Sequence, residues 1–192
     1  MWASYKEDMM IKIKKKFLKL IIYVCFVFTL FLMEATNVGE MGLKKYSSSF
    51  EIFDMMFKYN NDFVYSALSA LTEQGIHRYI KLLFVDFIFI ISFCYVQYDL
   101  TKIIIKKAKE KYKMIFVFVF LRACCDIIEN LLLLIILFNY PAQISHLVFL
   151  SSTFTSIKFI SIGLWIISIV VIIFLNLFQK KNKKYIEIKE GE

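Results

Sequence analysis

The sequence predicts an all-α membrane protein, a four-transmembrane-helix bundle with a short extracytoplasmic helical segment between its first and second helices. Three observations predict this class. Hydrophobic residues make up 59% of the 192 positions, the net charge is nevertheless +8, and four apolar segments are long enough to cross the membrane. Crossing about 30 Å of hydrocarbon takes roughly 20 helical residues. A mostly apolar chain with a large positive charge is typical of membrane spans joined by basic loops.

All 192 residues are expected to form a single membrane domain. We expect the four spans at residues 17–33, 79–98, 114–138 and about 147–178, the outer loop at 34–78, the inner loop at 99–113 and a cytoplasmic tail at 179–192. The fourth span begins at either Leu147 or Ile157, because the stretch between them is rich in Ser and Thr. Four spans place both ends of the chain on the same side of the membrane.

The first span resembles a secretory signal, because the basic run KIKKK precedes an apolar stretch. The following FLMEATNV lacks the small-x-small pattern of a cleavage site. We therefore expect an uncleaved signal anchor.

Lysine and arginine predict the orientation. Six lysines lie in residues 1–19, six in 101–113 and five after Phe178, whereas loop 34–78 holds four basic and six acidic residues. Because positively charged segments stay in the cytoplasm, we expect a multi-pass protein of the cell membrane with cytoplasmic termini and loop 34–78 outside. The expected partner is the lipid bilayer. No nucleic acid is expected, since the basic runs lack the interleaved aromatic residues of a nucleic-acid groove.

The outer loop is too short for an independent domain and too long for a turn. Ser47–Ser49 can cap a short turn carrying Phe50, Phe53 and Met56. Asn61 or Asp62 can then serve as the N-cap of a helix over residues 63–74, which Gly75 is placed to end. We expect a small helical lid over the outer face, either as part of a site or as a packed connector without a ligand role.

The most informative residues lie inside the third span. Arg122, Asp126, Glu129 and Asn130 fall on one side of a helix by their spacing. A charged residue at the bilayer centre costs roughly 2.5 to 3.5 kcal/mol, so this face is expected to turn inward toward polar partners. Asp86 of the second span and Thr155 and Lys158 of the fourth lie at a similar depth. The predicted polar cluster therefore comprises Asp86, Arg122, Asp126, Glu129, Asn130, Thr155 and Lys158.

If all its ionisable groups were charged, this cluster would carry a net charge of −1, so one carboxyl is expected to take up a proton or bind a cation. In a structural role, Arg122 would pair with Asp126, and Lys158 with Asp86 or Glu129, which would tie three spans together. In a functional role, Asp86, Asp126 and Glu129 would form the core of a site and would be the catalytic candidates of an enzyme.

Other chemistry has little support. Adjacent Cys124 and Cys125 diverge on a helix and do not form a redox pair. His77 and His146 are best interpreted as ordinary interfacial histidines, so no metal and no cofactor is expected. Phosphate-binding loops and the motifs of soluble hydrolases are absent from the sequence.

Short motifs across residues 50–160 resemble a set of four-span bacterial membrane proteins. The matching positions are Phe53, Asp54, Tyr59, Gly75, Tyr79, Asp86, Tyr95, Asp126, Glu129, Asn130, Thr155 and Lys158. The resemblance implies the four-span topology and a shared polar cluster, and it implies no activity. Arg122 and the Cys pair depart from the pattern.

The favoured function is that of a small non-enzymatic membrane bundle whose polar intramembrane cluster binds a lipid, a small ligand or a proton. The alternative is a small intramembrane enzyme that uses a buried carboxyl as acid or base on a lipid or isoprenoid substrate. A water-filled pocket between spans two and four would favour a lipid binder or an enzyme. A closed cluster with every carboxylate paired to Arg122 or Lys158 would favour a structural role.

Overall fold

The computed structural model describes residues 2–107 and 112–189, and this part of the chain is almost entirely helical, with no strand. The elements in order are α1 (Trp2–Ala35), α2 (Glu40–Leu43), the 3-10 helix η1 (Phe53–Met55), α3 (Asn61–Ala70), α4 (Glu73–Lys107), α5 (Ile115–Asn139) and α6 (Ser145–Lys189). Helices α1, α4 and α6 extend beyond the predicted spans into the basic segments. The helical fold class and the helical segment between the first two long helices are confirmed.

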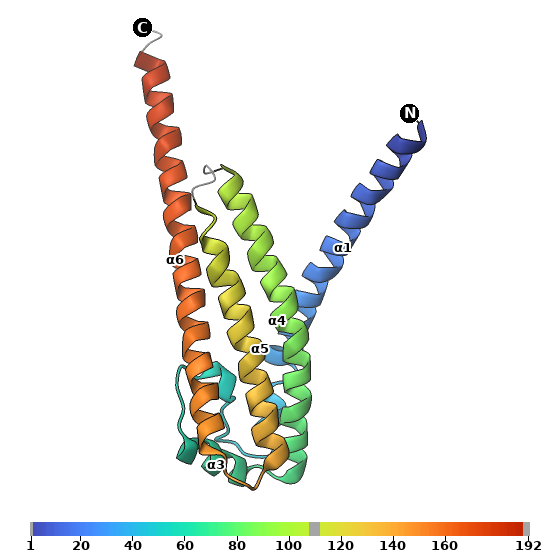
Figure 1. The fold of residues 1–192 in the computed structure, drawn as a ribbon, viewed down its shortest axis with the longest axis vertical. Coiled ribbons are helices and arrows are strands. Elements are labelled where there is room, and N and C mark those ends of the chain that lie inside the picture. The colour runs from blue at the N-terminus through green and yellow to red at the C-terminus, as the bar shows by residue number, and fades with distance from the viewer. Residues whose placement is uncertain (1, 108–111, 190–192) are drawn as a thin grey trace.

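Helices α4, α5 and α6 lie side by side as an antiparallel bundle, and α1 leans away from it toward its N-terminus (Figure 1). The ring of Phe26 stacks on those of Phe89 and Phe93, which holds α1 against α4. Nearer the N-terminus, Tyr23 donates to the Asp99 carboxylate at 2.8 Å, and Lys19 pairs with the same group at 2.6 Å. Both termini lie at the end of the molecule opposite α3 (Figure 1).

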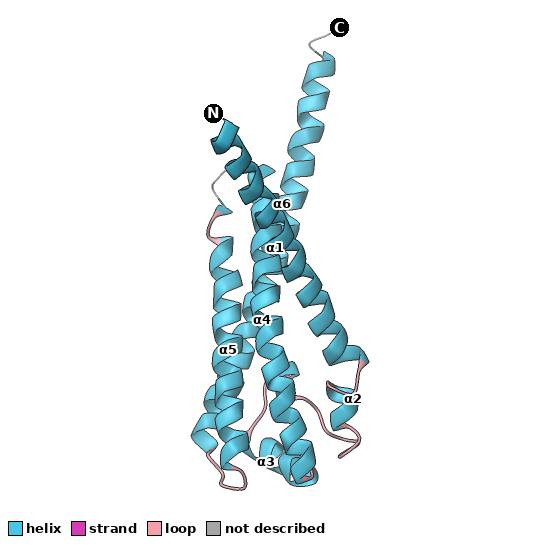
Figure 2. Cartoon of the chain, turned by 90° about the vertical axis from the view of Figure 1, so that its right-hand side faces the viewer, coloured by secondary structure: helices cyan, strands magenta, loops and turns pink. Residues whose placement is uncertain are grey.

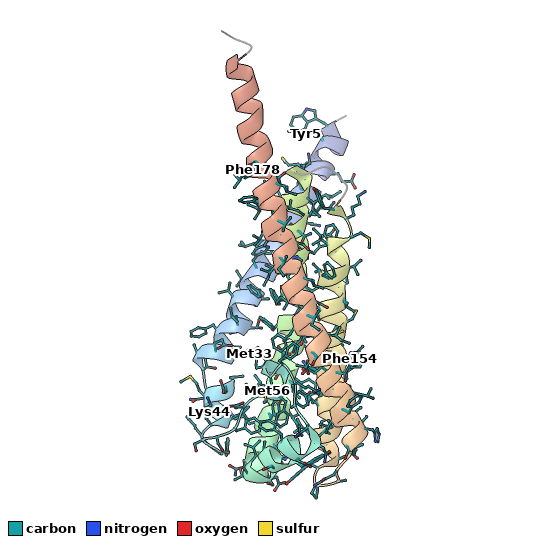
Figure 3. The ribbon with its side chains drawn as sticks, turned by 90° about the vertical axis from the view of Figure 1, so that its left-hand side faces the viewer. Tyr5, Met33, Lys44, Met56, Phe154 and Phe178 are labelled. Atoms are coloured by element: carbon teal, nitrogen blue, oxygen red, sulfur yellow. The ribbon has the colours of Figure 1, made fainter. Side chains whose placement is uncertain are left out.

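Three helices of the described residues, α1, α4 and α6, are long and apolar enough to cross a membrane. Helix α5 differs from them because Arg122, Asp126 and Glu129 interrupt its apolar sequence. Large apolar side chains are exposed along all four long helices (Figure 3), as expected of a surface in contact with lipid. The structure therefore supports a membrane protein with three apolar helices, while the predicted third span, which corresponds to α5, and the orientation stay predictions.

The segment between α1 and α4, residues 36–72, is called the outer segment after its predicted side of the membrane. It carries α2, η1 and α3 and packs at one end of the bundle, here called the loop end (Figure 2). Aromatic rings fix it there. Phe50 and Phe53 are fully buried against Tyr79 of α4, and the backbone N–H of Phe53 donates to the Tyr79 hydroxyl at 3.1 Å. The predicted turn carrying Phe50 and Phe53 is thus a core element and more than a surface lid.

The predicted boundaries of the outer helix were wrong. Asn60, rather than Asn61 or Asp62, caps α3, since its side chain accepts from the Phe63 N–H at 2.9 Å. The helix ends at Ala70, and Gly75 lies in the first turn of α4, where its N–H donates to the Thr72 hydroxyl. Thr72 thus starts α4, and Gly75 lies inside this new helix instead of ending the preceding one.

The interior has three layers. An apolar core at the loop end combines the outer segment with α4 and α5, including Leu68, Leu82 and Leu133. A second apolar core at the opposite end includes Val119, Trp165 and Ile172. The buried charged residues of α4, α5 and α6 lie between these two cores.

Candidate functional site

The buried charged residues between the two cores, called the polar layer, lie at the same height on three helices. Asp86, Asp126 and Lys158 each lie thirteen residues from the loop end of their helices, which begin or end there at Glu73, Asn139 and Ser145. At 1.5 Å per residue, each lies about 20 Å from the loop end. Residues on three helices therefore meet in one plane, as expected from the sequence.

Arg122 closes the side of the layer that faces the second core. Its guanidinium donates to the Asp126 carboxylate at 2.8 Å and to the backbone carbonyl of Ile90 at 3.3 Å. The ring of Phe93 lies 4.5 Å from the guanidinium carbon. Because only 2% of Arg122 is exposed, these contacts replace the water that the charge has lost.

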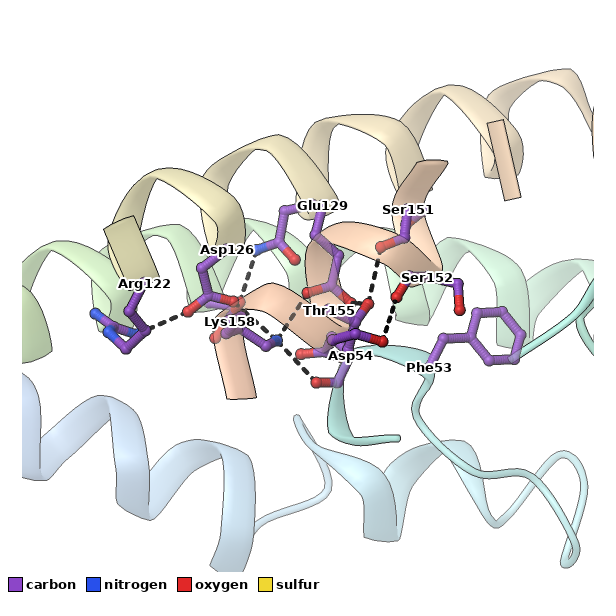
Figure 4. Close-up of polar contacts among 12 residues, drawn as sticks. Phe53, Asp54, Arg122, Asp126, Glu129, Ser151, Ser152, Thr155 and Lys158 are labelled. Atoms are coloured by element: carbon purple, nitrogen blue, oxygen red, sulfur yellow. Dashed lines mark hydrogen bonds and ion pairs between the residues drawn. The ribbon is translucent and has the colours of Figure 1, made fainter. Parts of the chain in front are cut away.

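Lys158 lies at the centre of the layer (Figure 4). Its ammonium is 3.0 Å from the Asp126 carboxylate and 2.8 Å from that of Glu129, both on α5. It also donates to the backbone carbonyl of Asp54 in η1 at 2.8 Å. One buried cation thus joins α6, α5 and the outer segment.

A row of hydroxyl groups continues from Glu129 toward the loop end. Thr155 donates a short hydrogen bond to the Glu129 carboxylate, and the Tyr59 hydroxyl contacts Ser151 at 2.7 Å and Thr155 at 3.3 Å. The backbone N–H of Tyr59 donates to the Ser152 hydroxyl at 2.9 Å. Burial raises the pKa of the Tyr59 phenol, so Tyr59 serves here as a neutral hydroxyl.

Asp86 belongs to a separate branch of the layer. Its carboxylate accepts from the Asn130 amide at 2.6 Å, which links α4 to α5. Among the described residues, no cation lies within ion-pair distance of Asp86, although only 4% of this residue is exposed. The prediction that Lys158 pairs with Asp86 or Glu129 thus holds for Glu129, and Asp126 takes the place of Asp86.

Asp54 is the charged residue that residue-by-residue reasoning missed. It lies in η1, is 5% exposed, and its Oδ1 has no hydrogen-bond partner within the described residues. Burial raises the pKa of the Asp54 carboxyl, an effect that the Lys158 ammonium opposes and the Asp126 carboxylate reinforces. The resemblance had included Asp54, but local spacing gave no sign that a loop residue would enter the layer.

The eight polar residues of this layer are called the acid–base cluster below. They are Asp54, Asp86, Arg122, Asp126, Glu129, Asn130, Thr155 and Lys158, all less than 10% exposed. Four carboxyls face two cations, so the fully ionised cluster would carry a net charge of −2, one unit more negative than the sequence predicted.

A cavity of about 270 Å³ lies between the end of α1, α2 and η1, and of the cluster residues only Asp54 is among those that line it. Asp54 forms its buried wall, and the more exposed wall carries Glu34, Glu40 and Glu51 together with methionine side chains. Asp54 is therefore the residue of the cluster that adjoins this cavity.

No family model, curated protein or solved structure matches this chain. The geometry of the cluster is therefore what indicates its function.

All seven residues predicted for the polar cluster are buried and lie in this layer, but their role as a functional site stays a prediction. Of the other positions in the resemblance, Phe53, Tyr59 and Tyr79 support the cluster, Gly75 lies at the start of α4 and Tyr95 is half-buried on α4. Cys124 is exposed and Cys125 buried, which agrees with their expected divergence. Within the described residues, no group of three His, Cys, Asp or Glu side chains could hold a metal ion.

Proposed function

We propose that this chain is a non-enzymatic four-span membrane protein whose acid–base cluster holds exchangeable protons. Support for α5 as a span, the third of the four in chain order, comes from its two faces. Its charged residues are buried, whereas Phe120, Leu131, Ile135 and Phe138 expose between 45% and 66% of their surface. Its 25 residues measure about 37 Å, enough to cross the hydrocarbon layer.

The observation that carries the proposal is the excess of buried carboxyls over cations. Asp126 and Glu129 are neutralised by Arg122 and Lys158. Asp54 and Asp86 have no such partner among the described residues, and leaving both ionised in a low-dielectric interior would be expensive. Two bound protons would remove this excess charge.

The cavity beside Asp54 supports access of these protons to one side of the cluster. The cavity at the loop end reaches Asp54, and the ammonium of Lys158 bonds the Asp54 backbone on the inner side. From Lys158, ion pairs lead to Asp126 and Glu129. A proton that enters at Asp54 would therefore change the field felt by the whole cluster. The alternative of an intramembrane enzyme requires a cavity at Asp86, Asp126 or Glu129 and stays a prediction.

Infrared spectroscopy of the full-length protein in lipid nanodiscs tests the proposal. At neutral pH, the wild type should show the carbonyl stretch of protonated carboxyls, and this band should disappear at high pH. Asp54→Asn and Asp86→Asn should each weaken the band, and the double variant should abolish it. Asp62→Asn is the matched control, because Asp62 is exposed at the start of α3. A wild type without the band, or a double variant that keeps it, would refute the proposal.

A further inference from the structure

A second polar site lies at the loop end on α4, separate from the acid–base cluster. It is a cavity of about 430 Å³, and residues of the outer segment and the first turns of α4 form its walls. The lining residues are Val38, Tyr46, Gln74, His77, Arg78 and Lys81. None of them contributes to the cluster.

Two permanently charged side chains, Arg78 and Lys81, line this cavity. Arg78 donates from Nε to the backbone carbonyl of Asn37 at 2.7 Å, which fixes its guanidinium. Within the described residues, the terminal amino groups of Arg78 have no acceptor, and neither Arg78 nor Lys81 has a carboxylate at ion-pair distance. The carboxylate of Glu73 is close instead to His77, at 3.9 Å. The cavity therefore favours an anion.

Phosphate is the anion that suits this arrangement best. A guanidinium presents two parallel N–H groups that match phosphate oxygens, and a flexible lysine adds a point charge. Gln74 and Tyr46 line the same cavity and carry further polar groups. The cavity also lies beside the N-terminus of a 35-residue helix, whose dipole favours negative charge.

An apolar stripe continues from the cavity along the same face of α4. Phe84, Ile88 and Ile91 follow Lys81 at helical spacing and expose 55%, 53% and 66% of their surface. The outward face of α4 thus changes from cationic to apolar between Lys81 and Phe84. A free phosphate would make no contact with this apolar stripe. A lipid without an anionic headgroup would make no ionic contact with Arg78 and Lys81.

We propose that this cavity binds the phosphate of an anionic phospholipid, whose acyl chain lies along Phe84, Ile88 and Ile91. Arg78 and Lys81 hold the headgroup, and the stripe adds apolar contact that a soluble anion lacks. The site orders one lipid molecule against α4 and the outer segment.

Thermal unfolding and native mass spectrometry of the full-length protein in detergent test this proposal with three probes, namely dioctanoyl phosphatidylglycerol, dioctanoyl phosphatidylcholine and glycerol phosphate. Phosphatidylglycerol should raise the unfolding temperature most and remain bound. Lys81→Gln should weaken its binding about fivefold, and the Arg78→Gln/Lys81→Gln double variant about thirtyfold. Lys58→Gln is the matched control, because Lys58 is an exposed lysine of the outer segment outside this cavity.

Phe84→Ser separates a lipid from a free anion, since it should weaken phosphatidylglycerol binding and leave glycerol phosphate binding unchanged. Lys81→Gln removes a side chain on the exposed face and keeps the test valid if Arg78→Gln disturbs folding. Unchanged phosphatidylglycerol affinity in the Lys81 variant would overturn the proposal. Equal stabilisation by glycerol phosphate would assign the cavity to a soluble anion, and equal stabilisation by phosphatidylcholine would exclude selection of an anionic headgroup.

Discussion

Lys158 neutralises two carboxylates at once, so its loss should be the most damaging single change in the acid–base cluster. Lys158→Met would leave Asp126 with Arg122 as its cation and Glu129 without any. Removing one partner of a buried ion pair costs about 3 to 5 kcal/mol, and we expect a loss of this size in the free energy of unfolding. Denaturation in mixed detergent micelles would measure it.

The double variant Lys158→Met/Glu129→Gln provides the internal control. Glutamine at position 129 removes the negative charge that Lys158→Met leaves without a cation. It keeps an oxygen that can accept from Thr155. Part of the lost stability should therefore return. A double variant no more stable than Lys158→Met would mean that the unpaired charge of Glu129 is not the source of the loss.

Asp54 should make stability depend on pH with a definite sign. Because burial raises the pKa of its carboxyl, the folded protein favours the protonated form. The contribution is fully present below the ordinary carboxyl pKa of about 4 and is lost as pH rises through the folded-state value. The unfolding temperature should therefore fall with rising pH, and Asp54→Asn should flatten this slope. An unchanged slope in the variant would assign the dependence to other groups.

At the scale of elements, the outer segment depends on close backbone contact at α2. A Cβ on Gly42 would lie 1.7 Å from the Asn37 carbonyl oxygen and 2.6 Å from Nε of Arg78. Gly42→Ala should therefore displace the segment and lower the unfolding temperature by several degrees, because the contact is with backbone that cannot move freely. Thermal unfolding in detergent would measure this change.

Gly163 provides the comparison for that substitution. A Cβ there meets no atom within 4 Å, and the residue lies in the middle of α6. Gly163→Ala should leave stability unchanged or raise it slightly, since alanine favours a helix by roughly 1 kcal/mol. Equal losses for both variants would show that the outer segment has no special sensitivity at Gly42.

At the scale of the whole molecule, the charge asymmetry predicts how the bundle lies in the membrane. Starting from a variant without native cysteines, a membrane-impermeant thiol reagent should label Ser48→Cys on intact cells, because residue 48 is exposed in the outer segment. Lys14→Cys, on the basic part of α1, should react only after permeabilisation. The reverse pattern would place the outer segment in the cytoplasm.

Periodicity predicted part of the cluster because it is a local property. The spacing of Arg122, Asp126 and Glu129 was enough to place them on one face, and the cost of exposing charge to lipid was enough to turn that face inward. Helix length likewise predicted that Lys158 and Asp86 lie at the same depth as these residues. Of the two partners expected for Lys158, Glu129 is correct and Asp86 is not, since spacing along a helix does not say which faces of two helices meet.

The sequence by itself determined the helical class, the apolar helices and the inward-facing charges, since hydropathy and helical period act over short stretches of chain. Tertiary structure decided that η1 enters the bundle and brings Asp54 to Lys158, 104 residues away along the chain. It also decided that the buried carboxyls exceed the cations by two and that one of them adjoins a cavity. These features depend on contacts between distant segments, which aromatic packing around Tyr79 fixes and no local pattern encodes.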